Sequence, residues 1–223
     1  MRALELFAGA GGLGMGVSLA GFHHDAVVEW DRDACDTLRE NKARGVRPVA
    51  DWPDVHEGDV RQFDYSSLKD RVDLVAGGPP CQPFSLGGKH RAFRDHRDMW
   101  PEAVRAIREL RPRAFIFENV RGLVRQAFAT YFEHILLQLT YPEIVRHEDE
   151  EWTAHRARLE RHHTTGRPDG LTYRVVFQVL NAADYGVPQR RPRVFVVGFR
   201  SDIHVDWAFP EPTHSREIGR AHV

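Results

Sequence analysis

The sequence predicts an α/β fold in which a mostly parallel sheet is covered by helices on both faces. Two observations carry this prediction. Short apolar runs alternate along most of the chain with stretches of helical length, which is the pattern of strand–helix repeats. A glycine-rich turn also follows the first apolar run directly and opens a helix. The chain has 223 residues, of which 42% are hydrophobic and 28% charged, so it is long enough for one sizeable globular domain.

The strands are predicted from short apolar runs bounded by glycine, proline or helix-capping residues. In chain order we expect them at residues 3–7, 26–30, near 55–57 (weakly), 72–76, 114–118, 171–180 and 193–199.

The helices are predicted between these strands, at residues 12–20, 31 to about 44, 100–110 and 123–139. Gly21 is a typical helix stop, and Asp31 is a good N-cap for the second helix. Pro101 is tolerated because it lies near the start of the third helix.

The segment from residue 141 to 170 differs from the rest because it is dense in charge and histidine and has few apolar anchors. We expect it to form a solvated helical insertion, with His162 and His163 at the surface rather than binding a metal. After residue 200 the pattern becomes irregular. Residues 1–200 are therefore predicted to form the domain, and residues 201–223 an irregular tail or the scar of a truncation.

The composition excludes several classes of protein. The formal net charge of −1 gives no global attraction to nucleic acid, so such a partner would need a local basic patch. Cys35 and Cys81 lack the spacing of disulfide scaffolds and zinc sites, and they fit a reducing cytoplasm. No apolar run reaches about 18 residues, which argues against a membrane span.

The glycine-rich turn satisfies the pattern GxGxxG through Gly9, Gly11 and Gly14. Glu29 ends the next predicted strand, where an acidic side chain can bind ribose hydroxyls. Trp30 offers a flat face for stacking on adenine. These residues indicate a nucleoside-containing cofactor, and both a nicotinamide dinucleotide and S-adenosylmethionine fit. Asp59 would accept the adenine amino group or would belong to a surface turn, and packing alone is the competing explanation for the glycines.

Cys81 lies in a stiff turn, Gly-Gly-Pro-Pro-Cys-Gln-Pro-Phe-Ser, directly after the predicted strand at residues 72–76. Glycine lets the backbone approach a ligand closely, and proline fixes φ. This places a thiol at the carboxyl end of a strand, where open α/β sheets bind their ligands. A buried structural cysteine is the alternative, and the turn by itself leaves both interpretations open.

Five motifs in order resemble those of the cytosine-C5 DNA methyltransferases. They are Leu-Glu-Leu-Phe-Ala-Gly from residue 4, Pro80-Cys81-Gln82, Glu118-Asn119-Val120, residues 180–188 and residues 189–195. The matching positions extend from about residue 4 to residue 199. The resemblance implies a Rossmann-like methyltransferase fold and S-adenosylmethionine as the methyl donor. It also implies double-stranded DNA with a flipped cytosine as substrate.

The resemblance assigns roles by motif position. The cofactor site would contain Phe7, Gly9, Gly11, Glu29, Trp30, Asp59 and Pro80. The catalytic residues would be Cys81, Glu118, Arg191 and Arg193. DNA would be contacted by Lys89, Arg91, Arg94 and Gln189.

The implied chemistry explains these residue types. Attack of the Cys81 thiolate on cytosine C6 activates C5 toward the methyl group, and Glu118 acts at N3 and the exocyclic amine. Arg191 or Arg193 would supply positive charge near the thiolate. The basic loop at residues 87–97 would contact phosphates, although an ordinary solvated loop explains it as well.

The chain departs from the family after residue 199, because about 25 residues are too few for a target-recognition region and the returning motifs. We therefore expect a catalytic-domain fragment without its target-recognition domain. A tRNA cytosine methyltransferase and an inactive binding fragment are the alternatives, and a nicotinamide-dependent oxidoreductase explains only the glycine turn and Glu29. A cognate restriction endonuclease is a candidate partner.

Overall fold

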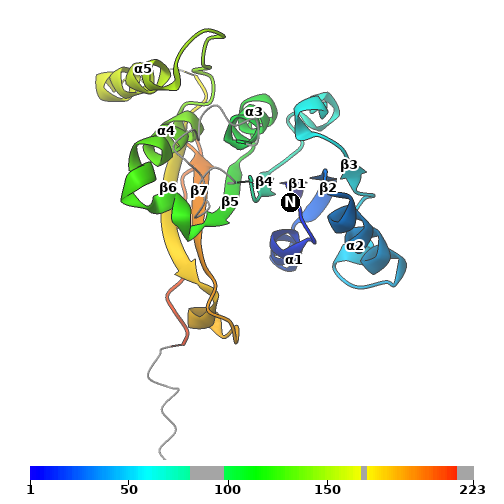
Figure 1. Ribbon diagram of the computed structural model, residues 1–223. Coiled ribbons are helices and arrows are strands. Elements are labelled where there is room, and N and C mark those ends of the chain that lie inside the picture. Colours follow the sequence, from blue (N-terminus) through cyan, green and yellow to red (C-terminus); the bar gives the residue numbers. More distant parts are fainter. Residues whose placement is uncertain (81–97, 167–169, 215–223) are drawn as a thin grey trace, which may run out of the picture.

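A seven-stranded sheet forms the centre of the protein, with the strand order β3-β2-β1-β4-β5-β7-β6. The structure is a computed structural model that describes residues 1–80, 98–166 and 170–214. Figure 1 shows the sheet with α1 and α2 on one side and α3 and α4 on the other. The strands are β1 Arg2–Leu6, β2 His23–Glu29, β3 His56–Glu57, β4 Leu74–Gly77, β5 Ala114–Val120, β6 Tyr173–Asn181 and β7 Pro192–Arg200. The helices are α1 Gly12–Leu19, α2 Arg32–Ala43, α3 Trp100–Leu110, α4 Ala129–Thr140 and α5 Trp152–Thr165.

The topology confirms the predicted α/β fold and fixes where a ligand can bind. The pairs β1–β2, β2–β3, β1–β4 and β4–β5 are parallel, and β7 runs antiparallel to both of its neighbours. Successive strands move outward from β1 in one direction and from β4 in the other. Ligands of open α/β sheets bind in the crevice that such a switch of direction opens at the carboxyl ends of the strands. The crevice therefore lies beyond Leu6 and Gly77.

The alternation of side chains in the central strands explains why both faces are covered. In β5, Phe115 and Phe117 point into the larger core, where they pack with Trp100 and Ile107 of α3. The intervening Ile116 packs on the opposite face, in a cluster that includes Val17 of α1. Because the strands are buried on both faces, they read in the sequence as continuous apolar runs.

The predicted helix boundaries are largely confirmed. Gly21 has φ +91°, a left-handed conformation that suits a residue just beyond a helix end. Asp31 caps α2, since its side chain accepts a hydrogen bond from the backbone N–H of Ala34 at 2.9 Å. Pro101 occupies the first turn of α3.

The prediction of one helix over residues 123–139 is wrong. Residues Arg121–Val124 and Gln126–Phe128 form two 3-10 turns, and α4 begins only at Ala129. Arg125 is extended, with φ −70° and ψ 150°, and interrupts the helical backbone. The first turn instead buries Leu123 completely. Tertiary packing of this side chain therefore outweighs the helix propensity of the segment.

The insertion at residues 141–170 contains α5, as expected, but it is anchored more firmly than its composition indicates. Leu159 and His155 are buried, and His155 Nδ1 lies 3.0 Å from Nε2 of His134 on α4. Burial lowers the pKa of His134 to about 3, so both histidines are neutral partners at neutral pH. The sequence did not reveal this buried histidine pair, because the charged residues around it dominate the segment.

Candidate active site

The glycine turn connects β1 to α1 at the crevice. Phe7, Gly9 and Gly11 all have positive φ, at +53°, +53° and +90°. A Cβ on Gly11 would lie 2.9 Å from Cδ2 of Leu38, so close packing and backbone conformation both require glycine there. A Cβ on Gly9, in contrast, would meet no described atom within 4 Å. Gly9 therefore presents bare backbone to open space, as a cofactor cradle requires.

Glu29 closes this turn from the end of β2. Its carboxylate accepts the backbone N–H groups of Gly9 at 2.6 Å and of Trp30 and Asp31 at 2.8 Å each. The side chain is 8% exposed. A carboxylate has about four acceptor positions, so these three bonds leave capacity for a ribose hydroxyl. Glu29 thus holds the glycine turn in place and can still bind a nucleoside.

Two further predicted cofactor residues lie at the same edge of the sheet. Trp30 directly follows Glu29 and is 70% exposed, so its ring is available for stacking on a base. Asp59 lies just beyond Gly58, whose N–H donates to the carbonyl oxygen of Glu29 at 2.9 Å. The Asp59 carboxylate is paired with the guanidinium of Arg61, which lowers the pKa of the carboxyl group. These groups fit a nucleoside-containing cofactor.

The turn after β4 lies between the glycine turn and β5. A Cβ on Gly77 would lie 2.3 Å from the carbonyl oxygen of Leu6, so only glycine permits this approach of β4 to β1. Asn119 donates from Nδ2 to the carbonyl oxygen of Pro79 at 2.9 Å. Asn119 is 6% exposed and therefore holds the proline turn rather than facing a substrate.

Glu118 marks the other side of the crevice. Its carboxylate Oε1 lies 3.1 Å from Nε of Arg193 and 3.8 Å from Nη2 of Arg191. The antiparallel register of β5 and β7 pairs Val120 with Arg193, which brings the arginine diagonally next to Glu118 on one face. The Glu118 side chain is 25% exposed. The arrangement is an accessible carboxylate held by two cationic side chains.

The structure therefore brings the predicted residues together in two groups. Phe7, Gly9, Gly11, Glu29, Trp30 and Asp59 surround the carboxyl ends of β1, β2 and β3, whereas Pro80, Glu118, Arg191 and Arg193 lie at β4, β5 and β7. Gln189 is exposed in the loop before β7. Cys81, Lys89, Arg91 and Arg94 lie outside the described residues.

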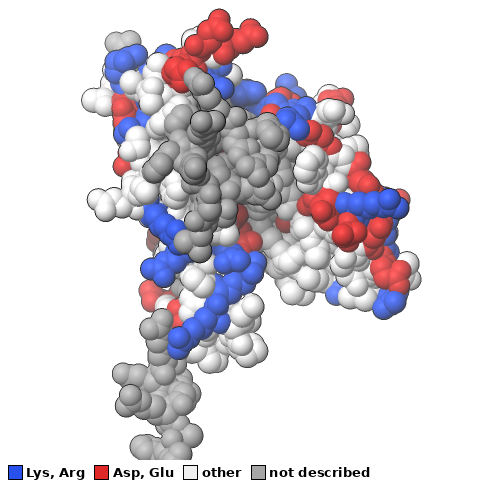
Figure 2. Space-filling view, in the orientation of Figure 1, with Lys and Arg blue, Asp and Glu red and all other residues white. Residues whose placement is uncertain are grey.

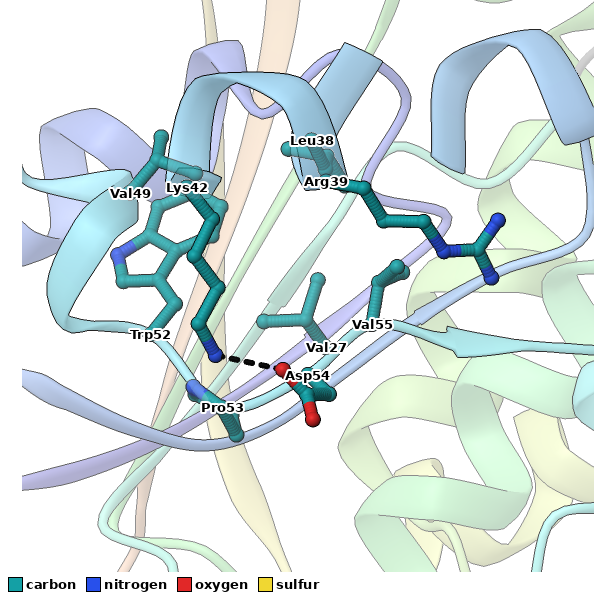
Figure 3. Close-up of a pocket in the computed structure, with 9 residues that line it drawn as sticks. All are labelled: Val27, Leu38, Arg39, Lys42, Val49, Trp52, Pro53, Asp54 and Val55. Carbon is teal, nitrogen blue, oxygen red and sulfur yellow. Dashed lines mark hydrogen bonds and ion pairs between the residues drawn. The ribbon is translucent and has the colours of Figure 1, made fainter. Parts of the chain in front are cut away.

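A small pocket elsewhere in the structure does not compete with this site. It has a volume of about 20 Å³ and lies between α2 and the segment from Val49 to Val55 (Figure 3). Such a volume holds about one water molecule. Lys42 and Asp54 form an ion pair at its mouth, at 2.7 Å (Figure 3). This pocket is too small for a nucleoside.

The described ranges contain neither a metal-binding cluster nor a membrane-spanning helix. Residues 1–80, 98–166 and 170–214 contain no group of three or more His, Cys, Asp or Glu side chains that could hold a metal ion. Within the same ranges, no helix has the length and apolar character needed to cross a bilayer.

Sequence reasoning missed two features of the site. Trp52 lies against the glycine turn, since a Cβ on Gly14 would be 2.8 Å from its ring. Arg61 donates a hydrogen bond from Nε to the Asp59 carboxylate at 3.0 Å. Nothing in the spacing of Trp52 signals this contact, whereas the Asp-Val-Arg spacing at residues 59–61 is short enough to suggest the ion pair.

A family model described as C-5 cytosine-specific DNA methylase matches residues 1–141 and 153–220 of the chain. The unmatched gap falls within the charged insertion. The chain is 40% identical to the Type II methyltransferase M.NgoMIV of Neisseria gonorrhoeae over 210 residues, which cover 94% of this chain and 55% of that protein. It is 36% identical over 221 residues to the Type II methyltransferase M.AquIA of a Picosynechococcus strain, covering 96% of this chain and 77% of that one.

Solved structures agree with the fold. The methyltransferase EhMeth of Entamoeba histolytica superimposes with a TM-score of 0.60 at 14% identity, covering 96% of this chain and 57% of that chain. The Dnmt2 methyltransferase of S. pombe gives a TM-score of 0.53 at 16% identity, covering 93% and 51%. At these identities the likeness concerns the fold alone. With 55% of M.NgoMIV and 42% of M.PspPI covered, the chain spans about half the length of several relatives that it matches.

Proposed function

The chain belongs to the family of C-5 cytosine-specific DNA methylases, and from that premise we propose that it provides the catalytic core for methylation of cytosine C5 in DNA. S-adenosylmethionine is the proposed methyl donor. One observation carries the proposal. The glycine turn follows β1, the Pro79-Pro80 turn follows β4, and Glu118 lies near the end of β5, and these three strands are adjacent in the sheet. A donor and a base bound there would face each other across the end of β4.

The cofactor side provides binding and orientation. S-adenosylmethionine, when bound, supplies an electrophilic methyl group on a positively charged sulfur. Gly9 offers open space beside its backbone, and the Glu29 carboxylate retains acceptor capacity for the ribose hydroxyls. The exposed ring of Trp30 would stack on adenine. Together these groups would hold the methyl group toward the end of β4.

The substrate side would carry the covalent chemistry. The Cys81 thiolate adds to C6 of an extruded cytosine, which breaks the aromaticity of the ring and makes C5 nucleophilic. C5 takes the methyl group, a base removes the proton from C5, and elimination releases the thiol and restores the double bond. Glu118 would accept a hydrogen bond from the exocyclic amino group of cytosine and, when protonated, would donate a hydrogen bond to N3. Arg191 and Arg193 would orient its carboxylate until the base enters.

Arginine side chains near Glu118 support DNA as the partner. Arg121 and Arg125 follow β5, Arg190 precedes β7, and all three are exposed. None of them has an acidic partner within the described part of the chain. Figure 2 shows Lys and Arg gathered over the lower ends of β6 and β7. Because the whole chain has a net charge of −1, this basic surface is a local feature that fits phosphates.

The partner enzyme, the cellular location and the recognition of the base sequence are proposed as well. The named relatives are Type II methyltransferases, which makes a cognate restriction endonuclease a candidate partner. A cytoplasmic location would keep the Cys81 thiol reduced. Since the chain spans 55% of M.NgoMIV, we propose that recognition of the base sequence depends on parts of the protein other than this chain.

Methyl transfer from radiolabelled S-adenosylmethionine tests the proposal. Cytosine-containing duplex DNA should accept label, and tRNA should not. Transfer to tRNA alone would replace DNA by RNA as the substrate. Calorimetry should detect binding of S-adenosylmethionine and not of NAD. Strong transfer to one specific DNA sequence by this chain alone would contradict the proposed dependence on other parts of the protein.

A further inference from the structure

A buried carboxylate lies directly beneath the glycine turn. Glu5 is the last residue but one of β1 and is 1% exposed. Its carboxyl carbon would lie 3.3 Å from a Cβ on Gly14, in the first turn of α1, and the backbone N–H of Gly14 lowers the pKa of the carboxyl group. The N-cap of α1 is Gly11, which has no side chain with which to cap the helix. Because the N-terminal N–H groups of a helix attract negative charge, Glu5 performs from the strand the role that an N-cap residue usually performs.

The partner of Glu5 is a histidine on the neighbouring strand. His24 Nε2 lies 3.7 Å from Glu5 Oε2, and the His24 side chain is fully buried. Neither atom has a hydrogen-bond partner among the described residues. Two unsatisfied polar atoms that face each other in a core are costly unless they share a proton. The geometry therefore indicates an interaction between this carboxylate and this imidazole.

The far side of the His24 ring determines where its proton lies. Ser18 Oγ accepts the indole N–H of Trp52 at 2.8 Å, so its own proton is free to point to His24 Nδ1 at 3.2 Å. His24 Nδ1 is then an acceptor, and the proton of the neutral ring lies on Nε2, directed at Glu5. Hydrogen bonds thus run from Trp52 through Ser18 to His24, and His24 Nε2 faces the Glu5 carboxylate at 3.7 Å.

Trp52 connects these residues to the glycine turn. Its ring would lie 3.2 Å from a Cβ on Gly11 and 2.8 Å from one on Gly14. The ring of His24 packs on it with centroids 4.6 Å apart. On its other side Trp52 lines the small pocket together with Leu38 and Val49 (Figure 3). The glycine turn is therefore held both at Gly14, through Glu5, and along its length, through Trp52.

Among the described residues, no other charge competes with the interaction between Glu5 and His24. The adjoining elements α1 and β4 contain no ionisable side chain, and Asp25 on β2 is paired with Arg2. Asp51, next to Trp52, is near Arg47 at the surface. Burial raises the pKa of Glu5, while His24 and the N–H of Gly14 act in the opposite direction. The protonation state of Glu5 thus depends on His24.

We propose that Glu5 and His24 are positioning residues, a buried proton-sharing pair that holds the first turn of α1 and the glycine turn in the shape that receives the nucleoside cofactor. This inference rests on the proposed function for the identity of the cofactor. Neither residue touches the cofactor, so both act through Gly14 and Trp52.

Calorimetric titration of the full chain with S-adenosylmethionine tests the link to the cofactor. Glu5→Gln should bind roughly tenfold more weakly, since it removes a charge-assisted interaction at the helix N-terminus. Glu40→Gln, an exposed acid on α2, is the matched control and should bind like the wild type. His24→Leu should weaken binding similarly. The double variant Glu5→Gln/His24→Leu should be less affected than the sum of the two single variants, since no unpaired charge remains.

The ¹⁵N shifts of the histidine rings test the pair without any cofactor. His24 should show the neutral tautomer protonated at Nε2 with a bare Nδ1, and Ser18→Ala should alter its Nδ1 signal. His23, the exposed neighbour in the same strand, should show mixed tautomers. A His24 that shows mixed tautomers like His23, or that carries its proton on Nδ1, would overturn the inference.

An error in the proposed cofactor and an error in the proposed positioning role would give different results. If the wild type binds no S-adenosylmethionine while His24 shows the expected tautomer, the proposed cofactor is wrong and the pair remains. If the wild type binds and a folded Glu5→Gln binds equally well, the positioning role is refuted and the proposed function stands.

Discussion

Glu29 and Glu118 occupy equivalent places in the fold and differ in how they are held. Each carboxylate lies near the carboxyl end of a parallel strand, on opposite sides of β1 and β4. Glu29 is bound by three backbone N–H groups, which cannot move without unfolding the turn. Glu118 is bound by the side chains of Arg191 and Arg193, which can change rotamer. One carboxylate is part of the scaffold, and the other can exchange its partners for a substrate.

This difference follows from what each side must bind. A cofactor that binds in one orientation benefits from a rigid site. A base that has to leave a DNA duplex requires a site that changes its contacts when the base arrives. Substitutions at the two carboxylates should therefore affect different properties of the protein.

The largest effect is expected at Glu118. Glu118→Gln should reduce methyl transfer by about 10²- to 10⁴-fold, because it removes the group that would act on the cytosine ring. Binding of S-adenosylmethionine and thermal stability should change little, since the side chain is held only by arginines at the surface. Single-turnover transfer rates, calorimetry and thermal melts measure the three quantities. A variant that transfers normally would remove Glu118 from the catalytic machinery.

Glu29→Gln should show the opposite pattern. An amide can replace only part of the acceptor capacity that now binds the N–H groups of Gly9, Trp30 and Asp31. We expect a loss of about 2 kcal/mol in the free energy of unfolding together with weaker cofactor binding. Urea denaturation and calorimetry provide the measurements. Full stability with normal cofactor affinity would show that the turn does not depend on this carboxylate.

A matched pair of glycine substitutions tests the rigidity of the cofactor side. Gly9→Ala should destabilise the protein by about 1 kcal/mol, because φ at this position is +53°. Gly16→Ala lies inside α1 with open space around it and should stabilise by about 0.5–1 kcal/mol. Thermal melts of both variants measure the difference. Equal effects would argue against a strained, preformed turn.

The smallest effects are expected at the exposed arginines of the substrate side. Arg121→Gln and Arg125→Gln should each reduce the slope of log affinity for DNA against log salt by about 0.9, the value for one phosphate contact. Arg161→Gln, an exposed residue of α5, should leave the slope unchanged. Fluorescence anisotropy at several salt concentrations measures it. Equal slopes for all variants would place the DNA elsewhere.

The two sides also differ in how far they could be predicted from sequence. The glycine turn and the Asp31 cap are local features whose conformations follow from neighbouring residues, and the structure confirms their arrangement. The ion pairs of Glu118 depend on the antiparallel register of β5 and β7, more than 70 residues apart. The Glu5–His24 pair and the position of Trp52 likewise arise only from tertiary packing. Arg125, which interrupts the helix expected at residues 123–139, shows the same limit for secondary structure.

Trapping with duplex DNA that contains 5-fluorocytosine tests the central claim most directly, since fluorine at C5 prevents the final elimination and preserves the bond between Cys81 and C6. With S-adenosylmethionine present, mass spectrometry should detect one covalent protein–DNA adduct that is absent in Cys81→Ser and retained in Cys35→Ser. An adduct that persists in Cys81→Ser, or methyl transfer to cytosine that survives this substitution, would contradict the proposed mechanism.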